Sequence, residues 1–479
     1  MIFDRTDPLM SCDWTSALSA ESSAQNAFLE LLNRNPQQAY SEYQDVRRQL
    51  VEERLLFGDK PVPMIFPPFV LSGSRWAELT RLLDRLNTIL AKIEPKLREK
   101  RWLDWLGFNE AEQAWIEIEN QIRPGYTISR VDGFLSEQPE SAGQYQIVEL
   151  NIDSPGGAAF LDVSSEIVCQ TSLWKEFQKS HPGRTIPFRE ALYDHVERVW
   201  ETYLADNPEV SSPEGRPRIA IVDWVTVSTH REFELIAQGL AARGYDTVVA
   251  DPRELSFSLG RLRCYDGKPI DLVYRRVLVE DMLRDPAGSR ALVEACRAGA
   301  VCLVNSFASK PLTVKSLLAL FHEPQAEELL CGEDLAEVKQ LVPLTLKLTA
   351  DNCDQVIKEQ ERFVLKPADG WGAQGLYLGW RCTREEWSEH VKRSLALGGY
   401  VAQDRVPIPK RSLPTWTGTQ WECFNYLFDL SPYGLAERSV SPLVRLSPSE
   451  VLNVKRGAQI AAVWVLDESS KICTPPSPD

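Results

Sequence analysis

The glycine-containing stretch 362–379 constrains the fold of this chain more than any other segment. It begins and ends with short apolar runs typical of β-strands. Between these runs Gly370, Gly372 and Gly375 permit backbone conformations closed to other residues and expose their N–H groups. Lys366 stands at the end of the first run. The pattern predicts a β-hairpin whose loop folds over a phosphate chain, with a lysine as a point charge beneath it.

This hairpin is not a Walker phosphate loop, because no Gly-Lys-Ser/Thr ends it and no helix follows it. In the nucleotide interpretation, Gly370, Gly372, Gln374 and Gly375 form the loop above the phosphates and Lys366 binds them. The alternative is a tight glycine hairpin with an exposed lysine. Other segments of the chain have to distinguish the two.

Composition limits the classes of partner. The chain has 479 residues, enough for two to four domains, and its 43% hydrophobic and 25% charged residues are usual for a soluble globular protein. A net charge of −15 disfavours non-specific binding to nucleic acids or anionic membranes. We therefore expect neither nucleic-acid nor membrane partners.

The sequence also indicates a compartment. The N-terminus shows no secretory signal, and no apolar run approaches the ~20 residues of a membrane span. The ten cysteines and five histidines are scattered without Cys-x-x-Cys spacing. Reduced thiols in a cytoplasmic protein, without a zinc site or a disulfide framework, are the expectation.

Hydrophobic periodicity divides the chain into regions. We expect a mainly helical region at 1–125, a ribbon and helices at 126–205, an alternating strand–helix region at 215–305, a mixed region containing the glycine hairpin at 306–465, and a flexible tail at 466–479. In the third region, the strands 218–223, 247–251, 271–276 and 301–305 alternate with helical segments. This alternation predicts a parallel sheet of the nucleotide-binding type.

The ribbon offers a second chemical signal. In its first strand Arg130 and Asp132 share a face, and in its second strand Glu149, Asn151 and Asp153 share a face. Carboxylate and amide oxygens are hard ligands of the kind Mg²⁺ uses together with phosphate oxygens. The same alternation occurs in any solvated strand pair, so the ribbon alone leaves both interpretations open.

Two further positions fit a nucleotide site. Lys315 lies in the first turns of an apolar-faced helix that follows a strand and a polar loop, where it would reach bound phosphates. A surface lysine is the alternative. Gln403 lies in a β-prone run whose backbone groups could meet the edge of an adenine.

The order of these motifs resembles the circularly permuted ATP-grasp proteins, and among them the glutathionylspermidine-synthase-like group. The matching segments are Arg130-x-Asp132, Glu149-x-Asn151 with Ser154, Tyr274-Arg-Arg276, Asn305 with Lys315, and Lys366 with its glycine loop. The ribbon precedes the lysines, whereas ordinary ATP-grasp chains have the reverse order. The resemblance spans about 126–465. It implies an α/β fold: a circularly permuted ATP-grasp core with an N-terminal helical region and a Rossmann-like pre-ATP-grasp substrate domain at 215–305.

The resemblance also implies roles for individual residues. Asp132, Glu149 and Asn151 would bind two Mg²⁺ ions, Lys315 and Lys366 the phosphates of ATP, and Gln403 the adenine, with the glycine loop as a lid. Arg130 and Ser154 would face the reacting carboxylate or acyl phosphate, and Arg445 would be a further anion-binding catalytic residue. Thr229 and Glu232, at the end of a parallel strand, and Arg276 are the expected acceptor-pocket residues.

The activity that the resemblance implies is ATP-dependent ligation of a carboxylate to an amine through an acyl phosphate, with release of ADP and phosphate. The substrates would be small molecules or peptides, and a homodimer is left open. No cysteine-amidase domain is visible and the substrate residues have no clear match, so glutathione and spermidine are not carried over. Two alternatives remain: a non-catalytic ATP-binding sensor or scaffold, and a phosphotransferase. The second needs a phosphohistidine partner, and only His230 lies near the expected cleft.

Overall fold

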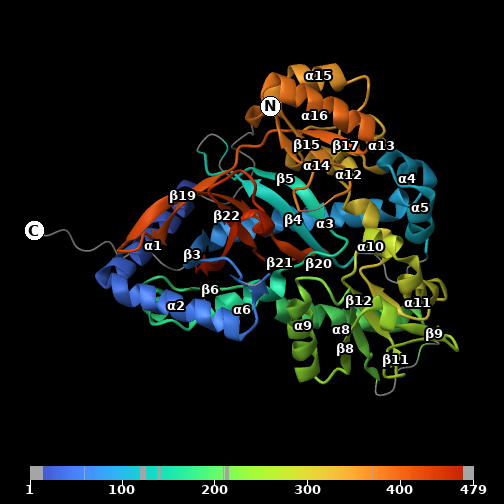
Figure 1. Ribbon diagram of the computed structural model, residues 1–479, viewed down its shortest axis with the longest axis horizontal. Helices are drawn as coiled ribbons and strands as arrows, with labels where there is room; N and C mark the ends of the chain where they lie inside the picture. Colours follow the sequence, from blue (N-terminus) through green and yellow to red (C-terminus); the bar gives the residue numbers. More distant parts are fainter. Residues whose placement is uncertain are drawn as a thin grey trace, which may run out of the picture.

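The computed structural model describes residues 14–58, 60–118, 126–138, 141, 143–208, 210, 215–370 and 372–467. Helices and sheets are both abundant, so the predicted α/β class is confirmed. Figure 1 shows the glycine-hairpin region around β15 and β17 as one lobe, the parallel sheet around β8 and β12 as another, and the ribbon β4–β5 between them. None of the helices in these ranges is long and apolar enough to cross a membrane.

The N-terminal region contains a buried strand in addition to the expected helices. Its elements are α1 (Trp14–Arg34), α2 (Pro36–Glu52), β1 (Leu56–Phe57), β2 (Lys60–Pro61), β3 (Met64–Ser72), α3 (Gly73–Leu97), α4 (Lys100–Leu106) and α5 (Glu110–Ile116). Every residue of β3 is buried. It therefore has no apolar–polar alternation, which explains why the sequence pattern of a mainly helical region at 1–125 did not reveal it.

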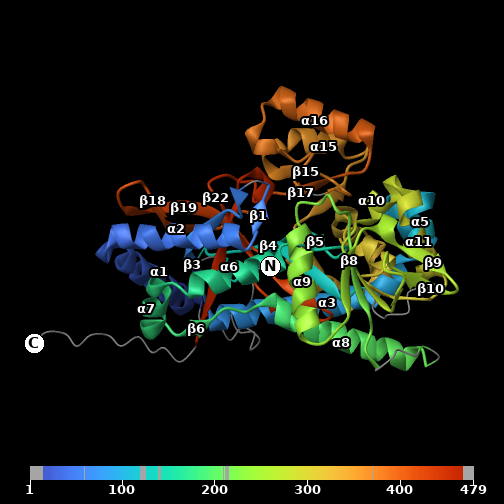
Figure 2. The same ribbon diagram turned by 60° about the horizontal axis from the view of Figure 1, so that its bottom comes forward.

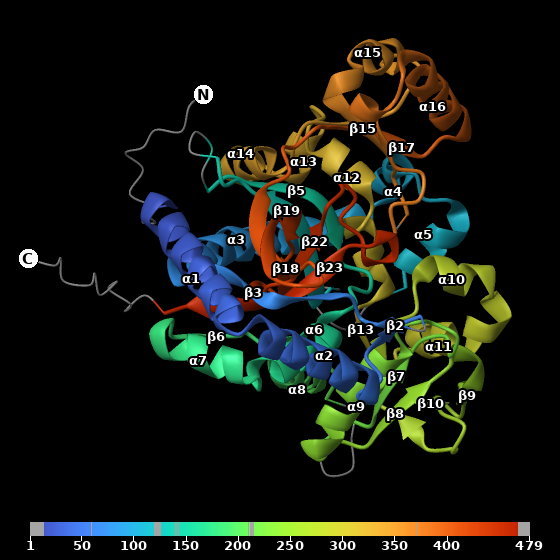
Figure 3. The ribbon, with the colours of Figure 1, turned by 60° about the vertical axis from the view of Figure 1, so that its left-hand side comes forward.

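Strand β3, from the N-terminal region, pairs with the last strand that the structure describes. It pairs in parallel with β23 (Gln459–Leu466) at one edge of the largest sheet. The other strands in this sheet are β18 (Lys410–Trp416), β19 (Trp421–Leu430), β22 (Val444–Ser447) and β6 (Gly183–Arg184). Figure 3 shows α1 and α2 lying against this sheet. Residues 468–479 of the expected tail lie outside the described residues.

The predicted ribbon is present. β4 (Ile128–Leu135) and β5 (Tyr145–Asn151) are antiparallel, with Arg130 opposite Asn151 and Asp132 opposite Glu149. The short strands β20 (Tyr433–Leu435) and β21 (Arg438–Ser441) extend this sheet. The helices that follow the ribbon are α6 (Ala158–Cys169), α7 (Ser172–Ser180) and α8 (Phe188–Asp206). The C-terminal half of the chain thus contributes strands directly to the ribbon.

The predicted parallel sheet is also present. Its order is β13–β12–β7–β8, built from β7 (Ile219–Val222), β8 (Thr247–Ala250), β12 (Leu272–Arg275) and β13 (Cys302–Val304). The helices of this region are α9 (His230–Ala242), α10 (Val279–Arg284) and α11 (Pro286–Arg297). Figure 2 shows α8 beside α9 along the outside of this region. A small antiparallel sheet, β9 (Ser256–Ser258), β10 (Arg261–Arg263) and β11 (Pro269–Ile270), is an addition that the sequence pattern did not predict.

The glycine hairpin belongs to a separate antiparallel sheet with the order β14–β17–β15–β16. Its strands are β14 (Thr345–Lys347), β15 (Phe363–Pro367), β16 (Tyr377–Leu378) and β17 (Tyr400–Asp404), and its helices are α15 (Cys353–Lys358) and α16 (Arg384–Leu397). A capping box of Thr383 and Glu386 begins α16. Before this sheet come the 3₁₀ helix η4 (Phe307–Leu312), α12 (Lys315–Leu320), α13 (Ala326–Leu329) and α14 (Gly332–Leu341).

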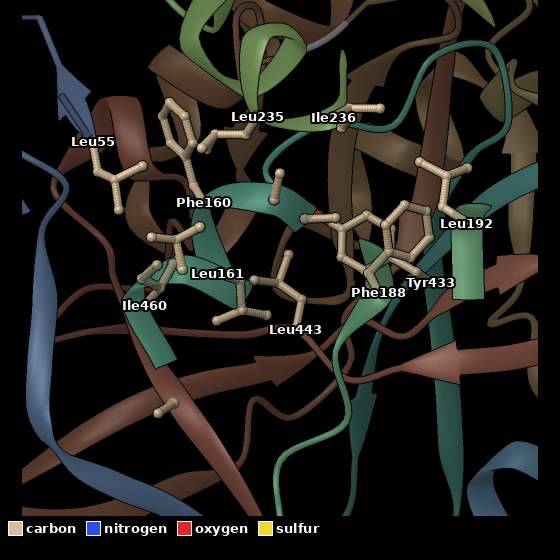
Figure 4. Close-up of a cluster of buried hydrophobic side chains, with 14 of the residues drawn as sticks. Leu55, Phe160, Leu161, Phe188, Leu192, Leu235, Ile236, Tyr433, Leu443 and Ile460 are labelled. Carbon is tan, nitrogen blue, oxygen red and sulfur yellow. The ribbon is translucent and has the colours of Figure 1, made fainter. Parts of the chain in front are cut away.

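One hydrophobic core connects segments from the whole chain. Figure 4 shows side chains from α6, α8, α9, β20 and β23 in contact, among them Phe160, Phe188, Leu235, Tyr433 and Ile460. These residues are buried. Burial of each large apolar side chain contributes about 1.5–3 kcal/mol. This core fixes the parallel sheet, α6 and the C-terminal strands with respect to one another, and the loop between β5 and α6 passes through their junction.

Candidate functional site

One cavity brings together the ribbon and the glycine hairpin. Asp132 and Glu149 from the ribbon line it, as do Lys315 and Lys366 from later segments. These four residues are far apart along the chain. The structure places all four around the same space.

Lys315 connects the ribbon to the glycine loop. Its Nζ lies 2.7 Å from Glu149 Oε1 and donates a hydrogen bond to the carbonyl of Gly370 at 2.9 Å. Its backbone N–H donates to the carbonyl of Ala368 at 2.7 Å. The side chain is nearly buried, which excludes the alternative of an ordinary surface lysine.

Lys366 points from β15 into the cavity. Its Nζ donates to Gln403 Oε1 at 2.6 Å and to the Val148 carbonyl at 3.2 Å. Burial lowers the pKa of Lys366 to about 8; Glu149 opposes this and the nearby charge of Lys315 adds to it. The ammonium form is therefore costly here, and a bound polyphosphate would offset that cost.

Two arginines and two aspartates form a network beside the cavity, and Asp132, Asp429 and Arg445 of this network line it. Arg130 donates to Asp132 Oδ1 at 2.7 Å and to Oδ2 at 3.1 Å, and Arg445 donates to Asp132 Oδ2 at 2.8 Å. Arg445 also lies 2.6 Å from Asp429. Although burial acts in the opposite direction, the two guanidinium groups lower the pKa of Asp132 below its usual range. Asp132 is thus an anion held by two cations.

The donor set fits Mg²⁺. Asp132 and Glu149 supply carboxylate oxygens that face the cavity, while Asn151 lines an adjoining cavity that Glu149 also lines. The Nδ2 atom of Asn151 is buried and has no hydrogen-bond partner among the described residues, and the carbonyl oxygen Oδ1 of the same amide is the atom that could bind a cation. No cluster of three His, Cys, Asp or Glu side chains within the described ranges could hold a metal. Any ion would therefore depend on mixed carboxylate, amide and phosphate oxygens, which is how Mg²⁺ is usually bound.

The glycine loop lies over the same cavity. Gly370, Gly372 and Gln374 line it, and Gly372 has a φ of +73°. Gly375 has a φ of +67°, and an added Cβ there would lie 2.7 Å from the hydroxyl of Tyr400. The loop thus requires glycine for its conformation as well as for its close packing. Trp371 lies outside the described residues.

The far side of this cavity is apolar. Gln403 lines it together with Leu378, Ile408, Val451 and Leu452. Such a surface suits a flat heteroaromatic ring. Val451 and Leu452, in the loop after β22, were not among the expected site residues. Glu450 fixes this loop by accepting a hydrogen bond from the Trp380 indole at 3.1 Å.

Two of the three predicted substrate residues, Glu232 and Arg276, contact the loop that follows β5. Glu232 is buried and accepts hydrogen bonds from the backbone N–H groups of Gly157 at 2.9 Å and Ala159 at 3.2 Å. Arg276 donates to the Pro155 carbonyl at 2.6 Å. Thr229 precedes α9 and makes no capping hydrogen bond with its side chain. None of the three lines either cavity. The contacts of Glu232 and Arg276 position the loop, and a direct substrate role for all three stays a prediction.

Ser154 and Arg130 do line the adjoining cavity. The Ser154 hydroxyl donates to the Arg276 carbonyl at 2.7 Å, and Arg130 donates to the Gly156 carbonyl at 3.1 Å. The guanidinium of Arg130 therefore reaches from the ribbon to this loop, between the two cavities.

Sequence analysis missed a charged group in the adjoining cavity. Lys310 is 1% exposed, and its Nζ lies 2.5 Å from Glu280 and 2.9 Å from Asp369. From the segment 305–315 the sequence analysis named Asn305 and Lys315 but not Lys310. The partners of Lys310 come from α10 and from the glycine loop, and no spacing in the sequence connects these positions.

Comparison with known proteins supports the same fold. Residues 138–442 match the family described as circularly permuted ATP-grasp type 2. A curated relative from Frankia casuarinae, named as a glutamate–cysteine ligase 2-2, is 24% identical over 279 residues, which is 55% of this chain. The chain spans only 31% of the length of that relative.

Solved structures extend the comparison. A glutathione synthetase-like effector from Globodera pallida, in its apo form, matches with a TM-score of 0.63 over 90% of this chain and 98% of its own, at 9% identity. A γ-glutamylcysteine synthetase from Methylobacillus flagellatus matches with a TM-score of 0.40 over 81% of this chain and 88% of its own, at 13% identity. The first likeness supports the fold, and the glutathionylspermidine-synthase-like group is not singled out. With its permuted order of ribbon and hairpin, and with the family match over most of its length, the chain belongs to the circularly permuted ATP-grasp type 2 family.

Proposed function

We propose that this protein is an ATP-dependent ligase that joins a carboxylate to an amine through an acyl phosphate, releasing ADP and phosphate. The observation that carries the proposal is the single cavity in which Glu149, Lys315 and Lys366 meet beneath the glycine loop. Membership of the ATP-grasp family supports the use of ATP.

In this proposal the apolar wall and Gln403 receive the adenine, while Lys315 and Lys366 bind the phosphates. Burial makes the charged form of Lys366 costly, and a bound polyanion would offset that cost. Lys315 pairs with Glu149 and would gain the phosphate as a second anionic partner. The backbone N–H groups of the glycine loop add uncharged donors.

Asp132, Glu149 and Asn151 are the residues that would hold Mg²⁺. When bound, Mg²⁺ neutralises phosphate oxygens and so favours phosphoryl transfer. The pairing of Asp132 with Arg130 and Arg445 keeps its carboxylate ionised, which is the form that a cation requires.

The chain's own residues then handle the carboxylate substrate. A carboxylate is a poor electrophile, and transfer of the γ-phosphoryl group converts its oxygen into a leaving group. Arg130, which lines the adjoining cavity, is placed to neutralise the negative charge that develops on the acyl oxygen when the amine attacks. Closure of the glycine loop would exclude water, which otherwise hydrolyses the acyl phosphate.

The substrates we propose are amino acids or short peptides. The Frankia casuarinae relative is named for a ligase that joins two amino acids, which supports this class. We further propose that the protein acts in the cytoplasm, without nucleic-acid or membrane partners, in line with its net charge of −15.

The test is a screen for ADP release. Purified protein, Mg²⁺ and ATP are incubated with pools of amino acids, short peptides and polyamines, and products are identified by mass spectrometry. Steady ADP release that requires one acid and one amine, with a product mass equal to their sum less water, is the expected result. ATP binding without ADP release from any pool would leave a nucleotide sensor and refute the ligase.

A further inference from the structure

The adjoining cavity lies directly beside the nucleotide cavity. Glu149 and Gly370 line both, so the two spaces share a wall. Arg130 and Ser154 line the adjoining cavity, and so do the charged residues Glu280, Lys310 and Asp369. A molecule in this space would lie next to the point where the phosphates of the nucleotide end.

The charges in this cavity leave a carboxylate without full compensation. Lys310 is the partner of both Glu280 and Asp369. Asp153 also lines the cavity, but it pairs with the buried guanidinium of Arg275. One ammonium group therefore serves two carboxylates, and the group of three carries a net negative charge. A cationic ligand would be attracted here and an anionic one repelled.

A specific atom lacks a partner. The Oε1 atom of Glu280 faces Lys310, whereas Oε2 is buried and has no hydrogen-bond partner among the described residues. A buried carboxylate oxygen left without a donor is unfavourable. Because this oxygen has almost no accessible surface, an N–H group from a ligand reaches it once the carboxylate turns toward the cavity that Glu280 lines.

We propose that this cavity receives the amine substrate, with Glu280 Oε2 accepting a hydrogen bond from its ammonium group and then taking up its proton. The inference rests on the proposed ligase function for its chemistry and names the acceptor as a primary amine that is cationic in solution.

Amide formation at this site needs only the amine, the acyl phosphate and the Glu280 carboxylate. One proton of the ammonium passes to the Glu280 carboxylate, which frees the nitrogen lone pair. The nitrogen then forms a bond to the acyl carbon, the bond from that carbon to the phosphate oxygen breaks, and phosphate leaves with the bonding electrons. The second nitrogen proton goes to the departing phosphate or to solvent.

The environment of Glu280 suits proton uptake at neutral pH. Burial raises the pKa of Glu280 to about 7, opposed by Lys310 and assisted by the negative charges of Asp369 and Asp153. Burial acts on Lys310 in the other direction, but these three carboxylates raise its pKa above the usual value, so it stays charged. Glu280 is therefore the group of this set that changes protonation near pH 7.

A purely structural role makes a different prediction. In that case the pairs of Lys310 only fasten the glycine loop to α10, and loss of the Glu280 charge would lower stability without affecting amines in particular. Asp281, the next residue on α10, offers a matched control, because its carboxylate pairs with Arg284 at the surface and does not line the cavity.

The experiment measures binding without turnover. Putrescine and ethylamine, with ethanol as a neutral probe, are titrated into the full-length protein loaded with MgADP. The wild type and Asp281→Asn are expected to bind both amines but not ethanol, and Glu280→Gln to bind them about ten- to a hundredfold more weakly. Equal affinities for Glu280→Gln and wild type, or no amine binding to the wild type, would overturn the proposal.

Two further measurements keep the outcome clear. If Glu280→Gln does not fold, wild-type crystals soaked in putrescine decide: a nitrogen within hydrogen-bond distance of Glu280 Oε2 supports the proposal, and any other position, or none, refutes it. Once an acid and an amine are known, turnover at limiting amine should rise through pH 7 in the wild type and lose this rise in Glu280→Gln. Failure of the ADP-release screen alone would refute the ligase and leave the binding result standing.

Discussion

Replacement of Lys366 by methionine tests the assignment of the nucleotide cavity most directly. Methionine fills most of the volume of the lysine stem and removes only the charge and the hydrogen bonds to Gln403 and the Val148 carbonyl. A charge-assisted hydrogen bond to phosphate is worth about 1.5–3 kcal/mol, so the Kd for MgATP should rise about 10- to 150-fold. Lys347→Met on strand β14 of the same sheet is the control, because Lys347 does not line the cavity.

The same variant has a second signature in stability. The pKa of Lys366 is lowered from 10.5 to about 8, so keeping it protonated in the ligand-free fold costs on the order of 2 kcal/mol once its partial exposure is considered. Because the folded pKa lies below the unfolded one, this cost is fully present below pH 8 and disappears as pH rises towards 10.5. At pH 7, Lys366→Met should therefore be more stable without ligand than the wild type, while binding ATP more weakly.

Calorimetry in buffers of different ionisation enthalpy completes the test. At pH 8 about half of the Lys366 side chains are neutral, and the anionic nucleotide should make the wild type take up about half a proton on binding, whereas Lys366→Met should take up none. Unchanged ATP affinity in the variant, together with equal proton uptake in both proteins, would show that the phosphates bind elsewhere.

Three other substitutions have distinct expected outcomes. Glu149→Gln should reduce kcat at least about a hundredfold while changing the Kd for ATP much less, measured by ADP release and calorimetry; unchanged turnover would remove Glu149 from the mechanism. Arg445→Met leaves Asp132 and Asp429 with one fewer buried partner and should lower the free energy of unfolding in urea by about 3–5 kcal/mol; a smaller loss than 1 kcal/mol would contradict the buried network. Asn305→Ala should cost about 3 kcal/mol in the same assay, because backbone donors of the ribbon lose their acceptor; wild-type stability would be the contrary result.

Local patterns were sufficient for much of the fold. The ribbon followed from alternation, since Asp132 and Glu149 had to face the same side once the strands paired. The parallel sheet was predicted from short apolar strands that alternate with helices. The hairpin with Lys366 was predicted from its three closely spaced glycines, which are rare between two strands. In each case the signal lies within about 30 residues, where spacing and side-chain periodicity determine which faces are shared.

Groups assembled from distant segments were beyond such reasoning. Glu280 lies in the first turn of α10 and resembles any surface acid until Lys310 approaches it across the cavity. Glu232 and Arg276 were correctly expected near the end of the parallel sheet, but their partners are backbone groups of the loop after β5, and backbone partners leave no trace in a sequence. The sequence pattern did not predict β3 for another reason. A strand that is buried on both faces has no alternation of apolar and polar residues.

The segment 305–315 explains how the two cavities are coupled. Asn305 accepts hydrogen bonds from the backbone of Thr127 and Ile128 and so attaches the parallel sheet to the ribbon. Lys310 joins α10 to the glycine loop, and Lys315 joins that loop to Glu149. Because Lys310 and Lys315 hold the same loop from its two cavities, an amine that binds the Glu280 partner of Lys310 and a phosphate that binds Lys315 each act on one of the loop's anchors. The amine and the nucleotide are therefore expected to bind interdependently, through a loop that each can move.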